Sequence, residues 1–242
     1  MVIKRPAAER GQTRTPWLDS RHTFSFNRYY DPRWSGFRQL LVINEDFIAP
    51  SGGFGAHTHS DMEILTYIVA GSLQHRDSLG NTSVIRAGEV QRMSAGTGVT
   101  HSEFNPSAEE PVHLLQIWLT PERRGAAPGY EQRAFTEEER GGRLRLIASH
   151  AGRDGAVTIH QDAEVYSGIL AAGEEAGHEL RAGRNAWVQV VKGSLSLNGV
   201  GLAAGDGAAV SGEERLTLQA GEPSEILLFD LARRRPRPSV FE

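Results

Sequence analysis

The sequence predicts an all-β protein in which one β-module occurs twice, and three observations favour this fold class. First, the apolar stretches of the 242-residue chain are short and rich in β-branched residues. They lie at residues 40–43, 64–69, 114–119, 188–191 and 226–229. Helical periodicity is weak, apart from a short acidic turn at 136–140. Short strands of this kind are typical of a β-sandwich or a β-barrel.

Second, turn-forming residues separate the apolar stretches. They are Asp-Pro at 31–32, Pro-Ser-Gly-Gly at 50–53, Leu-Gly-Asn at 79–81 and Asn-Gly at 198–199. Proline and glycine favour the backbone angles that reverse the chain, and asparagine and aspartate bond to their own backbone there. We therefore expect each apolar stretch to form a separate strand.

Third, the chain contains a faint internal repeat. Gly-Ser-Leu at 71–73 recurs at 193–195, each time after an apolar stretch. Ala-Gly-Glu at 87–89 is matched by Ala-Gly-Asp at 204–206. Because the two pairs occur in the same order, they indicate a duplicated module.

The boundary between the two copies is predicted from composition. The segment 121–142 is rich in proline, glycine and charge, which is typical of a connection between domains. We expect an N-terminal domain at 1–125, a linker at 126–142 and a C-terminal domain at 143–242.

Composition and charge limit the classes of partner. Hydrophobic residues make up 39% and charged residues 23% of the chain, and the formal net charge is −4. These values predict no general attraction to nucleic acid or to an anionic membrane. We interpret an arginine-rich run at 233–237 as a solvated tail. The N-terminus lacks the apolar segment of a signal peptide, so we expect a cytoplasmic protein without a membrane or direct nucleic-acid partner.

Two short motifs predict a metal site. His57-Thr58-His59 and His101-Ser102-Glu103 each place two metal-binding side chains two residues apart. Residues i and i+2 of a β-strand point to the same face, so each motif can direct both side chains at one point.

The ligand set of this site would be three imidazoles and one carboxylate. His57, His59, His101 and Glu103 can hold a mononuclear divalent transition metal and leave coordination positions open, which favours a catalytic role over a structural one. The chain has no cysteine, so thiolate ligands are excluded. The alternative is that the four side chains solvate two unrelated loops. Glycine and other small residues at 52–56 and 95–98 favour the metal site, because they permit tight turns and close approach to a ligand.

Glu63 competes with Glu103 for the carboxylate position. It follows His59 by four residues, so its side chain has the same orientation if the strand is unbroken. We prefer Glu103, because it lies two residues after His101 and therefore faces the same side of the strand. Glu63 is expected to support the site through a hydrogen bond, with direct metal binding as the alternative.

The remaining histidines are assigned structural or exposed positions. His113 alternates with Leu115 and Ile117 on an apolar face, so we expect it in the core. The others carry no spacing signal, namely His22, His75, His150, His160 and His178.

The second copy is expected to bind no metal. The residues at the offsets of His101 and Glu103 are Leu218 and Ala220, which cannot be ligands. His178 stands roughly where the first copy has His57, and it has no companion ligands.

Several segments together resemble the pirin family of the cupin superfamily. Residues 53–64 and 94–103 resemble its metal motif, and residues 21–26 resemble its N-terminal segment. Residues 29–32 and 42–46 are similar to bacterial pirin-like proteins. The likeness is strong from about residue 15 to residue 120 and looser beyond.

Two features depart from the general cupin pattern. Ser94 stands where many cupins have proline, and four residues rather than two separate Gly96 from His101. Both features are similar to pirins, so they narrow the family without weakening the metal prediction.

The resemblance implies a bicupin fold, with two jelly-roll β-barrels face to face and the metal in the N-terminal barrel. It implies His57, His59, His101 and Glu103 as ligands. Iron(II) is the usual metal, and zinc, nickel, manganese, cobalt and copper stay open.

Bacterial members of the family are associated with quercetin 2,3-dioxygenase activity. They open the central ring of a flavonol with O₂ and release carbon monoxide, so the resemblance implies a small planar aromatic substrate and O₂ as partners. We expect Glu103 to be the general base that takes the 3-hydroxyl proton. Two alternatives stay open, because fold alone does not determine function. One is a non-enzymatic regulator that senses redox state through iron, as animal pirins do, and the other is a cupin enzyme with another substrate.

Overall fold

The structure is a computed structural model that describes residues 1–233. The arginine-rich run at 233–237 therefore lies, apart from Arg233, outside the described residues. Among residues 1–233, no helix has the length and apolar character needed to cross a membrane.

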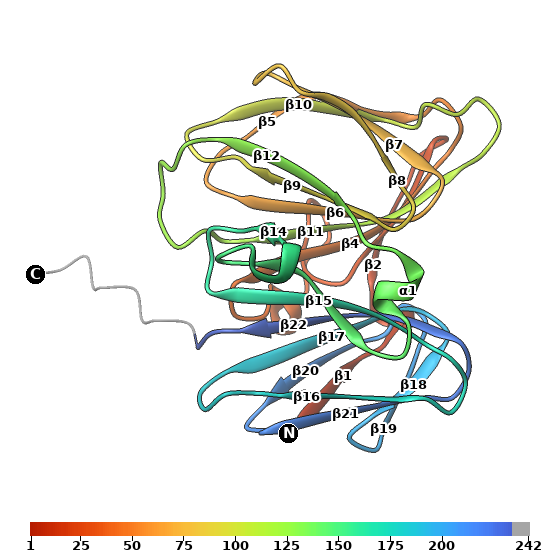
Figure 1. The fold of residues 1–242 in the computed structure, drawn as a ribbon. Helices are drawn as coiled ribbons and strands as arrows, with labels where there is room; N and C mark the ends of the chain where they lie inside the picture. Colours follow the sequence, from red (N-terminus) through yellow and green to blue (C-terminus); the bar gives the residue numbers. More distant parts are fainter. Residues whose placement is uncertain (234–242) are drawn as a thin grey trace, which may run out of the picture.

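The first half of the chain forms eleven strands that build one β-barrel. They are β2 (Gly11–Arg14), β3 (Leu18–His22), β4 (Leu40–Ile48), β5 (Gly53–His59), β6 (Glu63–Ala70), β7 (Ser72–Asp77), β8 (Thr82–Arg86), β9 (Glu89–Ser94), β10 (Val99–Phe104), β11 (Val112–Leu119) and β12 (Gly129–Ala134). The large sheet has the order β12-β9-β6-β11-β4-β3-β2, and the small sheet has the order β5-β10-β7-β8. This barrel is the upper one in Figure 1.

The second half repeats this arrangement in the lower barrel. Its strands are β13 (Leu144–Ser149), β14 (Val157–Thr158), β15 (Ala163–Leu170), β16 (Glu175–Glu179), β17 (Asn185–Lys192), β18 (Ser194–Leu197), β19 (Val200–Ala203), β20 (Gly207–Ser211), β21 (Arg215–Ala220) and β22 (Ser224–Leu231). The large sheet has the order β1-β20-β17-β22-β15-β13-β14, with β1 (Val2–Arg5), and the small sheet has the order β16-β21-β18-β19. The single α-helix of the described chain, α1 (Glu137–Arg140), and three 3-10 turns, Ala7–Glu9, Pro32–Trp34 and Arg153–Gly155, are short. The predicted all-β fold class is therefore confirmed.

The two large sheets pack against each other, and the main core lies between them. Leu65 and Ile117 of the first barrel share one buried cluster with Trp187, Leu227 and Phe229 of the second. The opposite faces of the same strands line the barrel interiors, so both faces are buried. Strands buried on both sides have continuous apolar runs rather than alternation, which explains the uniform apolar stretches in the sequence.

Each large sheet ends in a strand that comes from outside its expected domain. β1 pairs with β20 of the second barrel, with Val2 opposite Val210. β12 pairs with β9 of the first barrel, although it lies within the expected linker 126–142. The expected boundaries are therefore corrected at these two places. The physical reason is the same for β1 and β12. Each added strand forms hydrogen bonds with backbone groups of β20 or β9 that would otherwise lie unpaired at the edge of the sheet.

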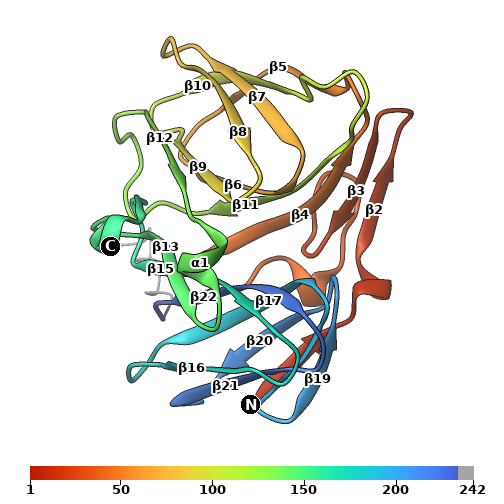
Figure 2. The same ribbon diagram turned by 45° about the vertical axis from the view of Figure 1, so that its right-hand side comes forward.

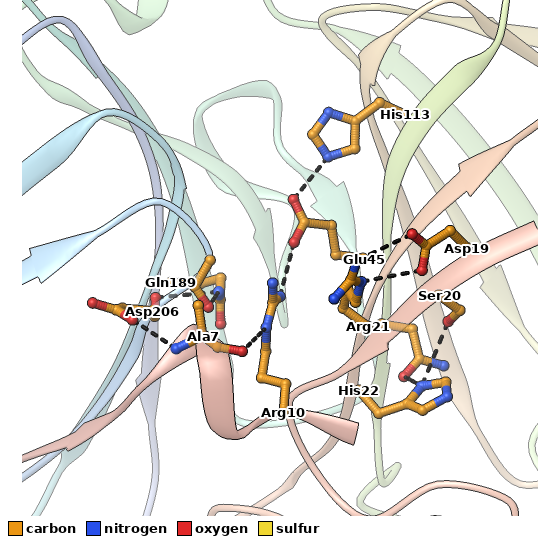
Figure 3. Close-up of polar contacts among 12 residues, drawn as sticks. Ala7, Arg10, Asp19, Ser20, Arg21, His22, Glu45, His113, Gln189 and Asp206 are labelled. Atoms are coloured by element: carbon orange, nitrogen blue, oxygen red, sulfur yellow. Dashed lines mark hydrogen bonds and ion pairs between the residues drawn. The ribbon is translucent and has the colours of Figure 1, made fainter. Parts of the chain in front are cut away.

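The segment after β1 joins the two barrels through polar contacts (Figure 3). The backbone N–H of Ala7 donates to Asp206 of the second barrel at 2.7 Å. Arg10 donates to Glu45 of β4 at 2.8 Å, and His113 of β11 donates to the other oxygen of Glu45 at 2.9 Å. His113 is therefore only partly buried, rather than in the core as expected, and it has a carboxylate as its polar partner.

In the second barrel, the position of His178 differs from the expectation. His178 lies opposite Leu216 on β21, as His59 lies opposite Val99 on β10. It therefore corresponds to His59 rather than to His57, a shift of one inward-facing position. Its Nε2 donates to Asp230 at 2.9 Å.

Candidate metal centre

The small sheet of the first barrel brings the two predicted motifs together. β5 and β10 are antiparallel neighbours, and His57 lies directly opposite His101. A bulge in the pairing between His101 and Glu103 shifts the register. β10 also pairs with β7, where Glu103 lies opposite His75. The strands are labelled in Figures 1 and 2.

Three histidines form a compact cluster. The ligand nitrogens of His57, His59 and His101 all lie within 4.8 Å of one another. The ring centroids are 4.8 Å apart for His57 and His59, 4.4 Å for His57 and His101, and 5.0 Å for His59 and His101. The Nδ1–H of His57 donates to the carbonyl oxygen of Gly55 at 2.8 Å, which leaves the Nε2 lone pair free to bind a metal.

Burial keeps two of these imidazoles neutral. It lowers the pKa of His101 to about 3, with His57 and His59 as further causes. Burial, with the neighbouring His57, lowers the pKa of His59 to about 4. An imidazole must be neutral to bind a metal, so both side chains are ready ligands at neutral pH.

Glu103 is buried next to this cluster. A carboxylate oxygen of Glu103 lies within 4.8 Å of ligand nitrogens of His75 and His101. The amide of Gln116 donates to its Oε2 at 2.9 Å, and the indole N–H of Trp118 donates to the amide oxygen of Gln116 at 3.2 Å. The chain of bonds from Trp118 to Glu103 fixes the orientation of the carboxylate.

The pKa of Glu103 is raised to about 7. Burial is the main cause and the nearby Asp46 carboxylate is the second, whereas the hydrogen bond from Gln116 opposes the shift. A carboxyl group with a pKa near 7 can take up or release a proton at neutral pH. A bound cation would favour its charged form.

His75 is a member of the site that the sequence analysis missed. It was assigned a structural or exposed position, yet its ring is fully buried and lies 5.4 Å from the ring of His101. Its Nε2–H donates to Asp77 at 3.0 Å. The signal was present, because His75 and Asp77 are a third pair with a spacing of two residues.

Glu63 does not have the role expected for it. Its carboxylate accepts bonds from Ser94 at 2.8 Å and from the backbone N–H of His160 at 3.1 Å, so it joins the two barrels. Glu63 does not face the same side as His59, because the strand is broken at residues 60–62, where Asp61 has a φ of 50°. The break directs Glu63 toward the second barrel.

An aromatic pair lies beside the histidines. Trp118 is edge-on to His59, with ring centroids 5.0 Å apart, and Phe26 is edge-on to Trp118 at 5.5 Å. Met62 and Met93 pack in the same area. This side of the cluster is therefore apolar and suits a planar aromatic ligand.

The polar atoms of the cluster fit a transition metal. Among the described residues, both ring nitrogens of the buried His101 have no hydrogen-bond partner. Buried polar atoms without partners are costly, and a metal ion would satisfy one of them. Imidazole and carboxylate donors together suit iron, nickel, zinc, manganese, cobalt or copper.

In the second barrel, apolar residues occupy three of the four corresponding positions, and His178 occupies the fourth. Ala176 lies opposite Leu218, and both are buried in one apolar cluster together with Ala220. A surface groove of about 550 Å³ lies on this barrel, and its lining contains no histidine or carboxylate. It is formed by Lys4, Ser194, Leu195, Ser196, Gly201, Leu202, Ala203, Gln219, Ala220 and Gly221.

Two stacked jelly-roll barrels with a histidine cluster in the first define a bicupin with a candidate metal centre. A family model described as Pirin matches residues 4–119, and one described as Quercetinase C-terminal cupin domain matches residues 146–231. The chain therefore belongs to the pirin family, and the predicted resemblance is confirmed.

Curated relatives match over nearly the whole chain. A protein named Quercetin 2,3-dioxygenase from Escherichia coli (strain K12) is 49% identical over 96% of this chain and 99% of its own length. A putative quercetin 2,3-dioxygenase from Pasteurella multocida is 46% identical over 96% of this chain and 100% of its own length. The predicted class, a quercetin 2,3-dioxygenase-like enzyme, is confirmed by these relatives.

Solved structures share the same fold. The crystal structure of YhhW from Escherichia coli has a TM-score of 0.93 and 48% identity, and it covers 98% of this chain and 100% of that one. The structure of bacterial pirin YhhW in complex with nickel(II) has a TM-score of 0.92 and 48% identity, over 96% of this chain and 100% of that one.

Proposed function

We propose that this protein is a metal-dependent dioxygenase that opens the central ring of flavonols such as quercetin with O₂ and releases carbon monoxide. The observation that carries the proposal is the cluster of His57, His59 and His101, with the buried Glu103 beside it. The name of the Escherichia coli relative supports the choice of substrate class.

We propose His57, His59, His101 and Glu103 as the metal ligands. Glu103 lies close to His101, and its carboxylate would complete the set begun by the three imidazoles. Iron(II) is the metal that we propose for the cell, and the nickel(II) complex of a bacterial pirin supports nickel as a second candidate. When bound, the metal supplies a Lewis acid for the flavonol oxygen and a place for O₂.

Glu103 is the proposed general base. Gln116 occupies only Oε2 of its carboxylate, so the other oxygen is available for the metal or for the 3-hydroxyl proton of the substrate. Its raised pKa favours proton uptake at neutral pH. Removal of that proton makes the flavonol electron-rich and therefore reactive toward O₂.

The aromatic pair is the proposed contact for the substrate rings. Trp118 and Phe26 present flat apolar surfaces beside His59. They would orient a planar molecule so that its 3-oxygen lies toward the histidines.

The test is oxygen uptake with quercetin, using protein of known metal content and a His101→Ala control. Uptake that is proportional to bound metal, is accompanied by carbon monoxide and disappears in the control is the expected result. No uptake by fully metal-loaded protein would refute the enzymatic proposal and favour a regulator that senses redox state.

A further inference from the structure

His75 and Asp77 form a buried pair that the proposed chemistry does not use. Both side chains are fully buried. Asp77 also accepts bonds from the backbone N–H groups of Leu79 and Asn81 and from the Asn81 side chain. Burial opposes the shift, but the hydrogen bond from His75 together with these bonds lowers the pKa of Asp77, so it is a charged acceptor.

The bond to Asp77 determines which nitrogen of His75 carries the proton. A carboxylate only accepts hydrogen bonds, so His75 must donate from Nε2. In the neutral ring, Nδ1 is then an acceptor with a free lone pair. Within the described part of the chain this Nδ1 is buried and has no hydrogen-bond partner.

His101 would need an acceptor for the N–H of one ring nitrogen. Metal binding would use one of its ring nitrogens, and the other would keep a buried proton that requires an acceptor. Among residues 1–233, neither nitrogen has a hydrogen-bond partner. One ring nitrogen of His75 lies within 4.8 Å of one ring nitrogen of His101, and the ring centroids are 5.4 Å apart, so the two rings are neighbours.

Glu103 is the other neighbour of His75, and it is the weaker candidate. Its carboxylate already accepts the amide N–H of Gln116. When Glu103 is charged as a metal ligand it can only accept, so a bond with His75 would need a second proton on His75, and a positive ring would be repelled by a cation held at His101.

We propose that Asp77 and His75 are positioning residues for the metal ligand His101. Asp77 holds the His75 ring, and Nδ1 of His75 accepts the remaining N–H of His101 when its other nitrogen binds the metal. The inference rests on the proposed metal centre. Such partners fix the ring and increase its basicity, and their loss typically weakens metal binding about 10- to 100-fold.

The test compares three variants by competition of nickel(II) with a chelator. His75→Leu keeps an apolar side chain of similar size but has no acceptor, and we expect about 10- to 100-fold weaker binding. His75→Gln keeps an acceptor oxygen, and we expect it to restore most of the affinity. His178→Leu is the matched control, because His178 also donates to a buried carboxylate but lies in the second barrel.

A second measurement distinguishes support from direct binding. Nitrogen-15 NMR of the zinc(II)-loaded protein should show a proton on the unbound nitrogen of His101 and a lone pair on Nδ1 of His75. Equal nickel affinities of the wild type, His75→Leu and His178→Leu would overturn the proposal, as would a metal-bound nitrogen of His75. A wild-type protein that binds neither metal would refute the proposed centre itself, which is a separate outcome.

Discussion

Replacement of Glu103 by glutamine should stabilise the metal-free protein. The folded state raises the pKa of Glu103 from 4.5 to about 7, so the charged form is disfavoured. A group with a raised pKa contributes stability that is present below its unfolded pKa and lost as the pH rises through its folded pKa. A shift of this size corresponds to about 3 kcal/mol at pH 8 and to less than about 1 kcal/mol at pH 5.

The assay is urea unfolding of metal-free wild type and Glu103→Gln at both pH values. Glutamine keeps the acceptor oxygen for Gln116 and removes only the charge. We expect the variant to have the higher free energy of unfolding by about 3 kcal/mol at pH 8 and to be nearly equal to the wild type at pH 5. The pH 5 comparison is the control, because Glu103 is already protonated there.

With nickel(II) bound, the order of stability should reverse. The wild type gains the binding free energy of a complete ligand set, whereas the variant has lost the charged ligand. A metal-free variant that is less stable than the wild type at pH 8 would refute the argument that burial opposes the charge of Glu103.

Three further outcomes are expected. Gln116→Leu should lower kcat with little change in KM for quercetin, because Glu103 loses its orienting bond; steady-state oxygen uptake measures this. Metal binding should weaken below about pH 7, where Glu103 takes up a proton, and metal should be lost steeply below about pH 4, where His59 and His101 also take up protons; metal analysis after dialysis from pH 7 to pH 3 checks it. Glu63→Gln should lower the free energy of unfolding by about 1–3 kcal/mol and leave nickel affinity unchanged; denaturant unfolding and chelator competition measure the two effects.

The proximity of the two motifs could be predicted because it follows from local geometry. A spacing of two residues within a strand places His57 with His59, whatever else surrounds them. That His101 lies opposite His57 is a matter of strand pairing, and a second motif of the same type made this pairing a reasonable inference.

The roles of Glu63 and β1 could not be predicted in the same way. The prediction for Glu63 assumed an unbroken strand after His59. The positive φ of Asp61 breaks that strand, so Glu63 faces away from the side of His59. β1 joins a sheet whose other strands lie more than a hundred residues later in the chain, and no local pattern specifies that pairing. Long-range pairing and one unusual backbone angle are the two kinds of information that the sequence patterns lacked.

The contrast between the two barrels explains why the first is suited to a cation. The second barrel fills three of the equivalent positions with the apolar residues Ala176, Leu218 and Ala220, and it pairs the fourth, His178, with Asp230. The first barrel instead buries Asp46 near Glu103, and burial raises the pKa of Asp46 to about 6. Asp46 in turn raises the pKa of Glu103, so two buried carboxyl groups make the metal-free interior costly. A divalent ion at the histidines would reverse that cost, so the residues that weaken the empty barrel are the ones that favour the metal.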